Sequence, residues 1–226
     1  MFIEYIAIMF KTLSQILIFL LATLVNSNAE ETKIFNFTAE ELKKLQVRKV
    51  RGANEVTIYT PGTNDIGNFL KAETKNGGAS GLGKEIKVNL NKTPFINITW
   101  KIEKGIEGIN ERSKKGHDFA ARVFVIKKTG LTPLSNKAIN YVFSSNEKVG
   151  QFWRSPYTKS SVDYVLSSTL ENKNKWVTVK ANVKEDFKKL HALDIDELSG
   201  IAIMTDTDQT EREVISFYQN IFFSSN

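Results

Sequence analysis

The feature that most constrains the fold is a two-residue alternation of apolar and polar side chains from Glu55 onward. Successive side chains of a β-strand point to opposite faces of a sheet, so this pattern predicts strands with one buried face. Turn residues such as Pro61-Gly62 separate the segments, and short strands at this spacing are typical of an antiparallel β-sandwich or jelly roll. The expected strands span residues 55–60, 67–75, 85–91, 95–103, 118–127, 137–145, 162–168, 176–182, 199–205 and 214–223.

Two short helices are expected beside these strands, at 39–47 and at 184–191. Thr38 and Glu41 have the spacing of a capping box, in which each side chain satisfies a free backbone N–H at the start of the helix. The second helix is expected to turn Phe187 toward the core. The chain is therefore predicted to be all-β with one or two short helices.

Composition is consistent with one folded domain over residues 30–226. Hydrophobic residues make up 41% of the chain, with 15 Phe, which is enough to build a sizeable core. Cysteine is absent, so a disulfide framework and a thiolate metal site are both excluded. Neither an internal repeat nor a linker divides the segment.

Residues 1–29 have the properties of a cleavable signal peptide. An unbroken apolar run covers 16–25, which is short for a permanent membrane span, and Lys11 precedes it. Small residues lead up to an expected cut between Ala29 and Glu30. Because the first eight residues are a poor leader, translation is expected to start at Met9. The mature chain is then exported, with no permanent membrane span.

The net charge of +6 does not indicate a nucleic-acid-binding protein. Lysine pairs are scattered, as at 43–44, 114–115 and 188–189, whereas nucleic-acid recognition needs basic and aromatic residues clustered on one face. We interpret these lysines as a solvated β surface.

The segment Gly78–Lys84 fits G-x-x-x-x-G-K but is not predicted to be a phosphate loop. A phosphate loop needs Ser or Thr next and a helix after it, whereas Glu85 follows and the next residues alternate as a strand. Leu82 also breaks the pattern of a nucleophile elbow. We interpret the segment as a glycine-rich turn.

The acidic segment 206–211 admits two interpretations. Asp206 and Asp208 are oxygen donors of the kind that Ca²⁺ prefers, so a calcium ion is a possible cofactor. In the favoured alternative, the segment is a turn whose side chains cap backbone N–H groups, and the protein has no cofactor.

Other chemistry-bearing residues carry weaker signals. Asp118 and Asp163, like the two aspartates above, qualify by residue type for the carboxylate pair of a glycosidase, but chain spacing does not show convergence. His117 stands at a strand start and is expected at the surface or in a hydrogen bond rather than as a base. The loop 153–157 is the best candidate for an exposed aromatic surface.

Alternation also assigns faces within two strands. In 95–103 it predicts a core face, and in 118–127 it separates two sets of four residues. The core face of the first strand is Ile96, Ile98, Trp100 and Ile102. The sets of the second strand are Phe119, Ala121, Val123 and Val125 on one face, and Asp118, Ala120, Arg122 and Phe124 on the other.

Many short segments in a fixed order resemble one family, between about Phe69 and Phe222. They are Leu70-Lys71-Ala72, Ala79-Ser80-Gly81-Leu82, Trp100-Lys101, Asp118-Phe119-Ala120-Ala121-Arg122-Val123, Ile139-Asn140-Tyr141-Val142, Ser155-Pro156-Tyr157, Trp176, Asn182-Val183, Asp186-Phe187 and Ile201 to Thr210. The chain thus resembles the bacterial domain-of-unknown-function family 3047.

The resemblance implies an exported bacterial protein, periplasmic or extracellular, with a jelly-roll-like sandwich similar to carbohydrate-binding modules. It implies no established activity, so it informs fold and location more than function. Three positions depart from the family pattern: His117 replaces a usual Asp, Thr99 a common Arg, and Phe143 a common Trp. A ligand site built on those positions is therefore expected to be altered here.

Three functional hypotheses remain open. We favour a non-catalytic binding domain for a saccharide or cell-envelope glycan, with no catalytic residue assigned. The first alternative is a glycan hydrolase or lyase using Asp118, Arg122 and Asp206, although Arg122 is equally expected to pair simply with Asp206. The second is a structural subunit of an envelope assembly. The expected ligand-binding residues are Trp100, Lys101, Asp118, Arg122, Tyr157, Asp206 and Asp208.

Overall fold

The computed structural model of the protein describes residues 29–132 and 135–226. The expected signal peptide, apart from Ala29, and the expected start at Met9 lie outside the described residues. Within these two ranges, no helix has both the length and the apolar character needed to cross a bilayer.

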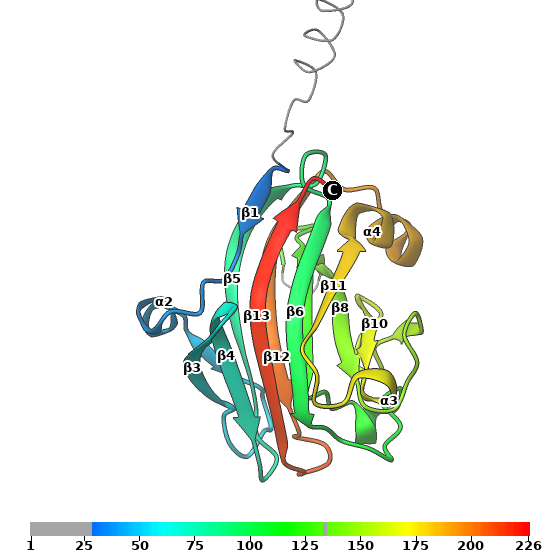
Figure 1. Ribbon diagram of the computed structural model, residues 1–226. Helices are drawn as coiled ribbons and strands as arrows, with labels where there is room; N and C mark the ends of the chain where they lie inside the picture. The colour runs from blue at the N-terminus through cyan, green and yellow to red at the C-terminus, as the bar shows by residue number, and fades with distance from the viewer. Residues whose placement is uncertain (1–28, 133–134) are drawn as a thin grey trace, which may run out of the picture.

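Two β-sheets pack face to face, which confirms the predicted all-β sandwich. Figure 1 looks onto the six-stranded sheet, with the seven-stranded sheet behind it. The six-stranded sheet has the order β11-β6-β13-β4-β3, with β1 beside β13. Its strands are β1 Glu31–Lys33, β3 Ile58–Asn64, β4 Gly67–Thr74, β6 Phe95–Lys104, β11 Val177–Asn182 and β13 Val214–Ser224.

The seven-stranded sheet has the order β2-β5-β12-β7-β8-β10-β9. Its strands are β2 Val47–Lys49, β5 Ala79–Asn89, β7 Ala121–Lys127, β8 Lys137–Ser144, β9 Phe152–Arg154, β10 Ser161–Ser168 and β12 Glu197–Asp206. Every pair of neighbouring strands is antiparallel except β8 and β10, which run parallel. The pattern of alternation did not predict this parallel pair, nor the three-residue strands β1, β2 and β9.

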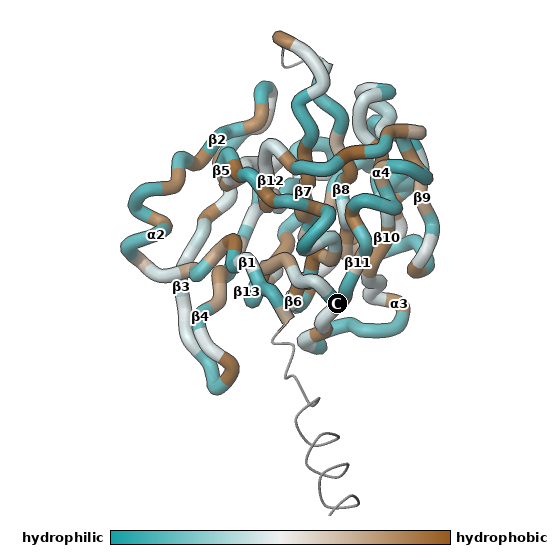
Figure 2. The backbone as a smooth tube through the Cα atoms, turned by 90° about the horizontal axis from the view of Figure 1, so that it is seen from above, coloured by the Kyte–Doolittle hydropathy of each residue, from teal (hydrophilic) through white to brown (hydrophobic). Residues whose placement is uncertain are grey.

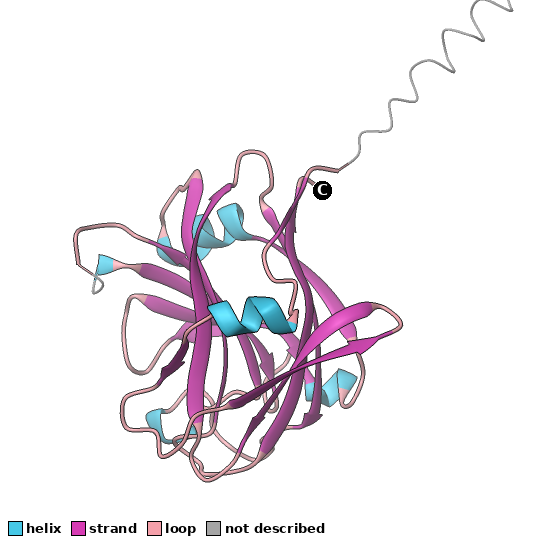
Figure 3. Cartoon of the chain, turned by 90° about the vertical axis from the view of Figure 1, so that its left-hand side faces the viewer, coloured by secondary structure: helices cyan, strands magenta, loops and turns pink. Residues whose placement is uncertain are grey.

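The helices are short and lie among the connecting segments (Figure 3). They are α2 Ala39–Lys44, α3 Thr169–Asn172, α4 Val183–His191 and the 3₁₀ turn η1 Lys114–Gly116. Both expected helices are present, and the Thr38 hydroxyl accepts from the backbone N–H of Glu41 as the capping box predicts. Phe187 of α4 is fully buried, as expected.

The space between the sheets holds one hydrophobic core built from alternate residues of both. The predicted inner face of β6 is confirmed, because Ile96, Ile98, Trp100 and Ile102 are all fully buried. Full burial of one such side chain stabilises the fold by about 1.5–3 kcal/mol. Figure 2 shows the same alternation as hydrophobic and hydrophilic segments succeeding each other along the strands.

Three local predictions are wrong. Pro61-Gly62, expected as a turn, lies inside β3, and the turn between β3 and β4 is at residues 65–66. The segment Gly78–Lys84, expected as a glycine-rich turn, belongs to strand β5 from Ala79 onward. A glycine fits this strand because Gly81 lies close against β12, where a Cβ would come within 3.1 Å of the Ile203 carbonyl oxygen. Phe119, expected on one face with Ala121, Val123 and Val125, does not join them in the main core and packs with Val142 and Val165 in a separate small cluster. Strand β7 begins only at Ala121, so alternation does not extend back to Phe119.

Candidate functional site

A cleft of about 350 Å³ lies on the outer face of the seven-stranded sheet. Strands β7, β8, β10 and β12 supply Arg122, Asn140, Asp163 and Asp206 to its walls. Strand periodicity explains their position. Arg122, for example, stands between Ala121 and Val123, which both belong to the core, so its side chain points to the opposite, outer face. The connecting segments add further lining residues, among them His117, Ser155, Tyr157, Thr158 and Asp208.

A buried ion pair forms one side of the cleft. Nη2 of Arg122 donates to Oδ2 of Asp206, and both side chains are almost fully buried. The other carboxylate oxygen of Asp206 accepts from the backbone N–H of Phe119 at 3.2 Å. The guanidinium lies over the rings of Phe119 and Phe124, with its carbon 5.2 and 5.4 Å from the ring centroids. Nε of Arg122 is buried and has no hydrogen-bond partner among the described residues.

Three carboxylates converge beside that guanidinium. Asp118, Asp206 and Asp208 each place one oxygen within 4.8 Å of the others. Burial raises the pKa of Asp118, and burial raises the pKa of Asp206 well above its usual range despite the opposing charge of Arg122. The carboxylate of Asp118 accepts from the backbone N–H groups of Gln209 (3.2 Å) and Thr210 (2.7 Å). Residues 208–210 thus form a turn, but its backbone N–H groups are capped by Asp118, which lies outside the segment 206–211.

A second buried network forms the opposite side. Nε2 of His117 lies 2.8 Å from Oδ2 of Asp163, and Nδ2 of Asn140 donates to the other oxygen of Asp163 at 2.6 Å. Because a carboxylate only accepts, the imidazole carries its proton on Nε2. The amide orientation is fixed in the same way, which leaves Oδ1 of Asn140 buried without a partner among the described residues.

Tyr157 forms an aromatic rim at the mouth of the cleft. Its side chain is 52% exposed, and its hydroxyl donates to the carbonyl oxygen of Lys114 at 2.9 Å. Its ring meets that of His117 edge to face, with 5.5 Å between the centroids. Burial raises the pKa of the Tyr157 hydroxyl, as do the nearby charges of Asp208 and Asp118. The ring is thus held in one orientation while keeping an exposed surface.

The structure brings five of the seven expected site residues together: Asp118, Arg122, Tyr157, Asp206 and Asp208. The other two lie on β6 of the opposite sheet. Trp100 is fully buried in the core, where Nε1 donates to Oγ of Ser167 at 2.9 Å. Lys101 lies beside Glu103, with its ammonium 4.6 Å from the ring centroid of Phe217. Neither is part of the cleft, because β6 belongs to the six-stranded sheet. The prediction was wrong for these two residues because an alternating pattern does not reveal to which sheet a strand belongs.

The sequence did not assign the three residues of the second buried network to the ligand site. His117 was expected as a surface or hydrogen-bonding residue; it does hydrogen-bond, but it is buried at 7% exposure. Asp163 qualifies from the sequence by its residue type alone, and Asn140 is not among the expected site residues. A usable signal existed for Asn140, since it is an amide in the otherwise apolar segment Ile139–Phe143. An isolated polar residue in such a strand must find partners when it is buried.

Solved structures similar to this chain include a family 11 carbohydrate-binding module from Clostridium thermocellum in complex with a β-1,3-1,4-mixed-linked tetrasaccharide. The TM-score is 0.47 at 12% identity, with 87% of this chain and 96% of that chain covered. A family 30 carbohydrate-binding module from a cellulosomal cellulase of the same organism gives 0.48 at 9%, covering 87% and 98%. The xyloglucanase domain of NopAA from Sinorhizobium fredii, in complex with cellobiose, gives 0.43 at 12%, covering 80% and 97%.

Comparison by sequence gives two further findings. No curated protein matches the chain. A family model described as "Protein of unknown function (DUF3047)" matches residues 43–222.

Proposed function

The chain belongs to the DUF3047 family, and we propose that it is an exported, non-catalytic saccharide-binding protein whose site is the cleft around Arg122 and Asn140. The observation that carries the proposal is the pair of unsatisfied buried atoms in that cleft. Arg122 Nε is a donor and Asn140 Oδ1 is an acceptor. A sugar hydroxyl both donates and accepts, so one polyhydroxylated ligand can satisfy both atoms.

Energetics favour a ligand at these atoms. A buried polar group left without a hydrogen bond costs about 1–3 kcal/mol, and a bound hydroxyl removes that cost. Both groups are held in place before binding, Arg122 by Asp206 and Asn140 by Asp163. Preorganised groups lose little conformational entropy on binding, so more of the contact energy contributes to affinity.

The exposed ring of Tyr157 supplies the apolar part of the contact. A pyranose ring has an apolar face of C–H groups, and an aromatic side chain offers a flat surface to it. The hydrogen bond from Tyr157 to Lys114 fixes the orientation of that surface.

The hydrogen bonds that Asp118 and Asp206 already make favour binding over catalysis. Asp118 accepts two backbone N–H groups, and Asp206 holds Arg122 and a backbone N–H. A general acid or base must exchange a proton with its substrate during the reaction. Carboxylates that hold a turn and a guanidinium in place serve the architecture of the cleft instead.

Calorimetric titration of the purified protein with a panel of oligosaccharides tests this function. We expect at least one saccharide to bind, and Tyr157→Ala to weaken it about tenfold, because an aromatic contact contributes about 0.5–1.5 kcal/mol. Phe152→Ala is the matched control, since Phe152 is also an exposed aromatic (46%) but does not line the cleft. Absence of binding across the panel, or an equal loss in both variants, contradicts the proposal.

The proposal of export is based on the leader-like segment before Glu30. Cleavage between Ala29 and Glu30 is compatible with the fold. Strand β1 begins at Glu31, and the backbone nitrogen of Glu30 lies 3.2 Å from Oγ of Ser225, so cleavage after Ala29 leaves the strand intact. Expression of the full chain in a Gram-negative host should give a periplasmic protein whose N-terminal residue, by mass spectrometry, is Glu30. An intact leader or a cytoplasmic product contradicts export.

A further inference from the structure

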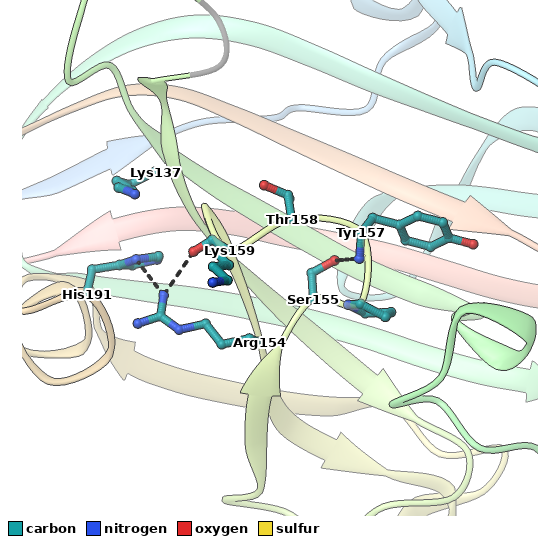
Figure 4. A pocket seen from close by; sticks show the side chains of 8 residues that line it. Lys137, Arg154, Ser155, Tyr157, Thr158, Lys159 and His191 are labelled. Carbon is teal, nitrogen blue, oxygen red and sulfur yellow. Dashed lines mark hydrogen bonds between the residues drawn. The ribbon is translucent and has the colours of Figure 1, made fainter.

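A second hollow, of about 660 Å³, adjoins the saccharide cleft. The two share Ser155, Tyr157 and Thr158, so one surface continues from the cleft across this loop into the hollow. Figure 4 shows its lining, with Lys137, Lys159, Arg154 and His191 grouped on the side away from Tyr157. We call these four residues the basic pocket.

The basic pocket carries positive charge that no acidic residue of its own lining offsets. No acidic residue lines the hollow. Many lysines of the protein pair with a glutamate or aspartate. By contrast, no salt bridge among the described residues includes Lys137, Lys159 or Arg154. Three cations without a counter-ion around one hollow produce a local positive potential.

Arg154 is held in position by uncharged groups. Nη1 donates to the carbonyl oxygen of Lys159 at 3.1 Å, and Nη2 donates to that of Leu190 at 3.0 Å. Backbone carbonyls orient the guanidinium but do not neutralise it. The charge of Arg154 is therefore fixed at the edge of the pocket before any ligand arrives.

His191 links α4 to this arrangement. Its Nε2 donates to the carbonyl oxygen of Ala138 at 2.9 Å, so Nδ1 is the acceptor that faces Nη1 of Arg154 at 3.3 Å. Burial lowers the pKa of His191, and the charges of Arg154 and Lys137 lower it further. The imidazole thus responds to the same positive potential.

We propose that the basic pocket binds an oxyanion substituent of the saccharide, so that the ligand of the adjoining cleft is an acidic rather than a neutral glycan. This inference rests on the proposed function and specifies its ligand class. The neutral part of the ligand contacts Tyr157 and the cleft, and its carboxylate or sulfate lies among Lys137, Lys159 and Arg154. The shared loop 155–158 places both contacts within reach of one oligosaccharide.

The test compares oligosaccharides matched in length, measured by calorimetry at low and high salt. Oligogalacturonate represents carboxylates, a sulfated galactan fragment represents sulfates, and a neutral galactan fragment is the reference. We expect an acidic ligand to bind at least tenfold more tightly than the neutral one, with an advantage that shrinks as salt increases. Whichever acidic ligand binds more tightly identifies the oxyanion. Equal or tighter binding of the neutral ligand overturns the inference but leaves the saccharide function intact.

Variants locate the charge contact. Lys137→Gln/Lys159→Gln should lower affinity for the acidic ligand about tenfold, equivalent to about 1.4 kcal/mol, and leave the neutral ligand unchanged. Lys87→Gln, an exposed lysine of β5 outside both hollows, is the control and should change neither. An equal loss for acidic and neutral ligands overturns the assignment.

A second measurement judges the pocket without any saccharide. The chain has two histidines, so the ring protons of His191 can be assigned by NMR with one His191→Gln variant. Sodium sulfate, titrated against sodium chloride at equal ionic strength, should shift the His191 signals along a saturating curve that Lys137→Gln/Lys159→Gln removes. A flat or non-saturating response overturns the pocket even if saccharides bind to the cleft.

Discussion

At the scale of single residues, the cleft depends on one cation surrounded by carboxylates. Arg122 pairs with Asp206, and Asp118 and Asp208 converge on the same point. Each buried carboxylate is costly, because its charge is removed from water. The guanidinium offsets that cost together with the backbone N–H groups that donate to Asp118 and Asp206. The stability of the sheet around the cleft is therefore sensitive to substitution of Arg122.

Arg122→Met should lower the free energy of unfolding by about 3–5 kcal/mol, because it leaves a buried carboxylate without its partner. The double variant Arg122→Met/Asp206→Asn should recover part of the loss, since the stranded charge is then absent. Urea unfolding of both variants beside the parent measures this. A loss below about 1 kcal/mol for Arg122→Met, or no recovery in the double variant, contradicts the assigned role.

Asp118 should make stability depend on pH. Burial raises its pKa in the folded state, so the folded protein holds this proton more tightly than the unfolded chain. The resulting stabilisation is present below the unfolded pKa of about 3.9 and is lost as pH rises through the folded pKa. Asp118→Asn does not titrate and removes this component.

Urea unfolding at pH 4 and pH 7 tests the sign. The parent should lose stability relative to Asp118→Asn on going to pH 7. Asp65→Asn, at an exposed position outside the cluster, should follow the parent. A relative gain by the parent at pH 7 means that Asp118 is stabilised in its charged form, contrary to the prediction.

At the scale of elements, the positions of strands can be predicted from the sequence because alternation is a local pattern. The pairing of strands within a sheet cannot be predicted in this way, because it joins residues far apart in the chain. Trp100 and Lys101 were placed with Arg122 because each lies on a strand with one apolar face, yet β6 belongs to the other sheet. The pairing of Asn140 with Asp163 depends on β8 and β10 lying side by side in parallel, and no periodicity encodes strand direction. The sequence could therefore mark Asn140 as a polar residue in need of partners, but it could not predict that Asp163 is its partner.

Two glycines on the paired strands β5 and β12, Gly81 and Gly200, illustrate a constraint between elements. A Cβ on Gly81 would lie 3.1 Å from the carbonyl oxygen of Ile203, an atom fixed within β12, whereas the nearest atom to a Cβ on Gly200 is 3.6 Å away. Gly81→Ala should therefore destabilise the protein by about 1 kcal/mol through overpacking. Gly200→Ala should be neutral, or stabilising by about 0.4–1 kcal/mol through the unfolded state. Thermal unfolding compares them, and a reversed order contradicts the packing argument.

At the scale of the whole molecule, the outer faces of the two sheets differ in character. The seven-stranded sheet carries the buried polar networks. The six-stranded sheet carries an aromatic cluster of Phe69, Trp176 and Phe217, with centroid separations of 5.6–6.1 Å. We assign ligand binding to the first face and packing to the second.

Trp176→Ala separates these roles. It should lower the free energy of unfolding by about 1–2 kcal/mol, because a half-buried aromatic is lost, and leave saccharide affinity unchanged. Tyr157→Ala should lower the saccharide affinity and leave the free energy of unfolding nearly unchanged. Calorimetry and urea unfolding on the same preparations give both quantities, and a loss of binding in Trp176→Ala moves the site to the six-stranded sheet.

The parallel pairing of β8 and β10 has a consequence for how this fold can diversify. A chain that leaves one strand and enters its parallel neighbour must travel back along the sheet, and here it does so through β9 before turning at 155–160. That turn lines both hollows, so the route that the backbone is obliged to take also forms part of the proposed ligand site. Substitutions at the tip of this turn would change the lining of both hollows without disturbing the strand pairing, whereas deletion of the return path would require one strand to reverse its direction.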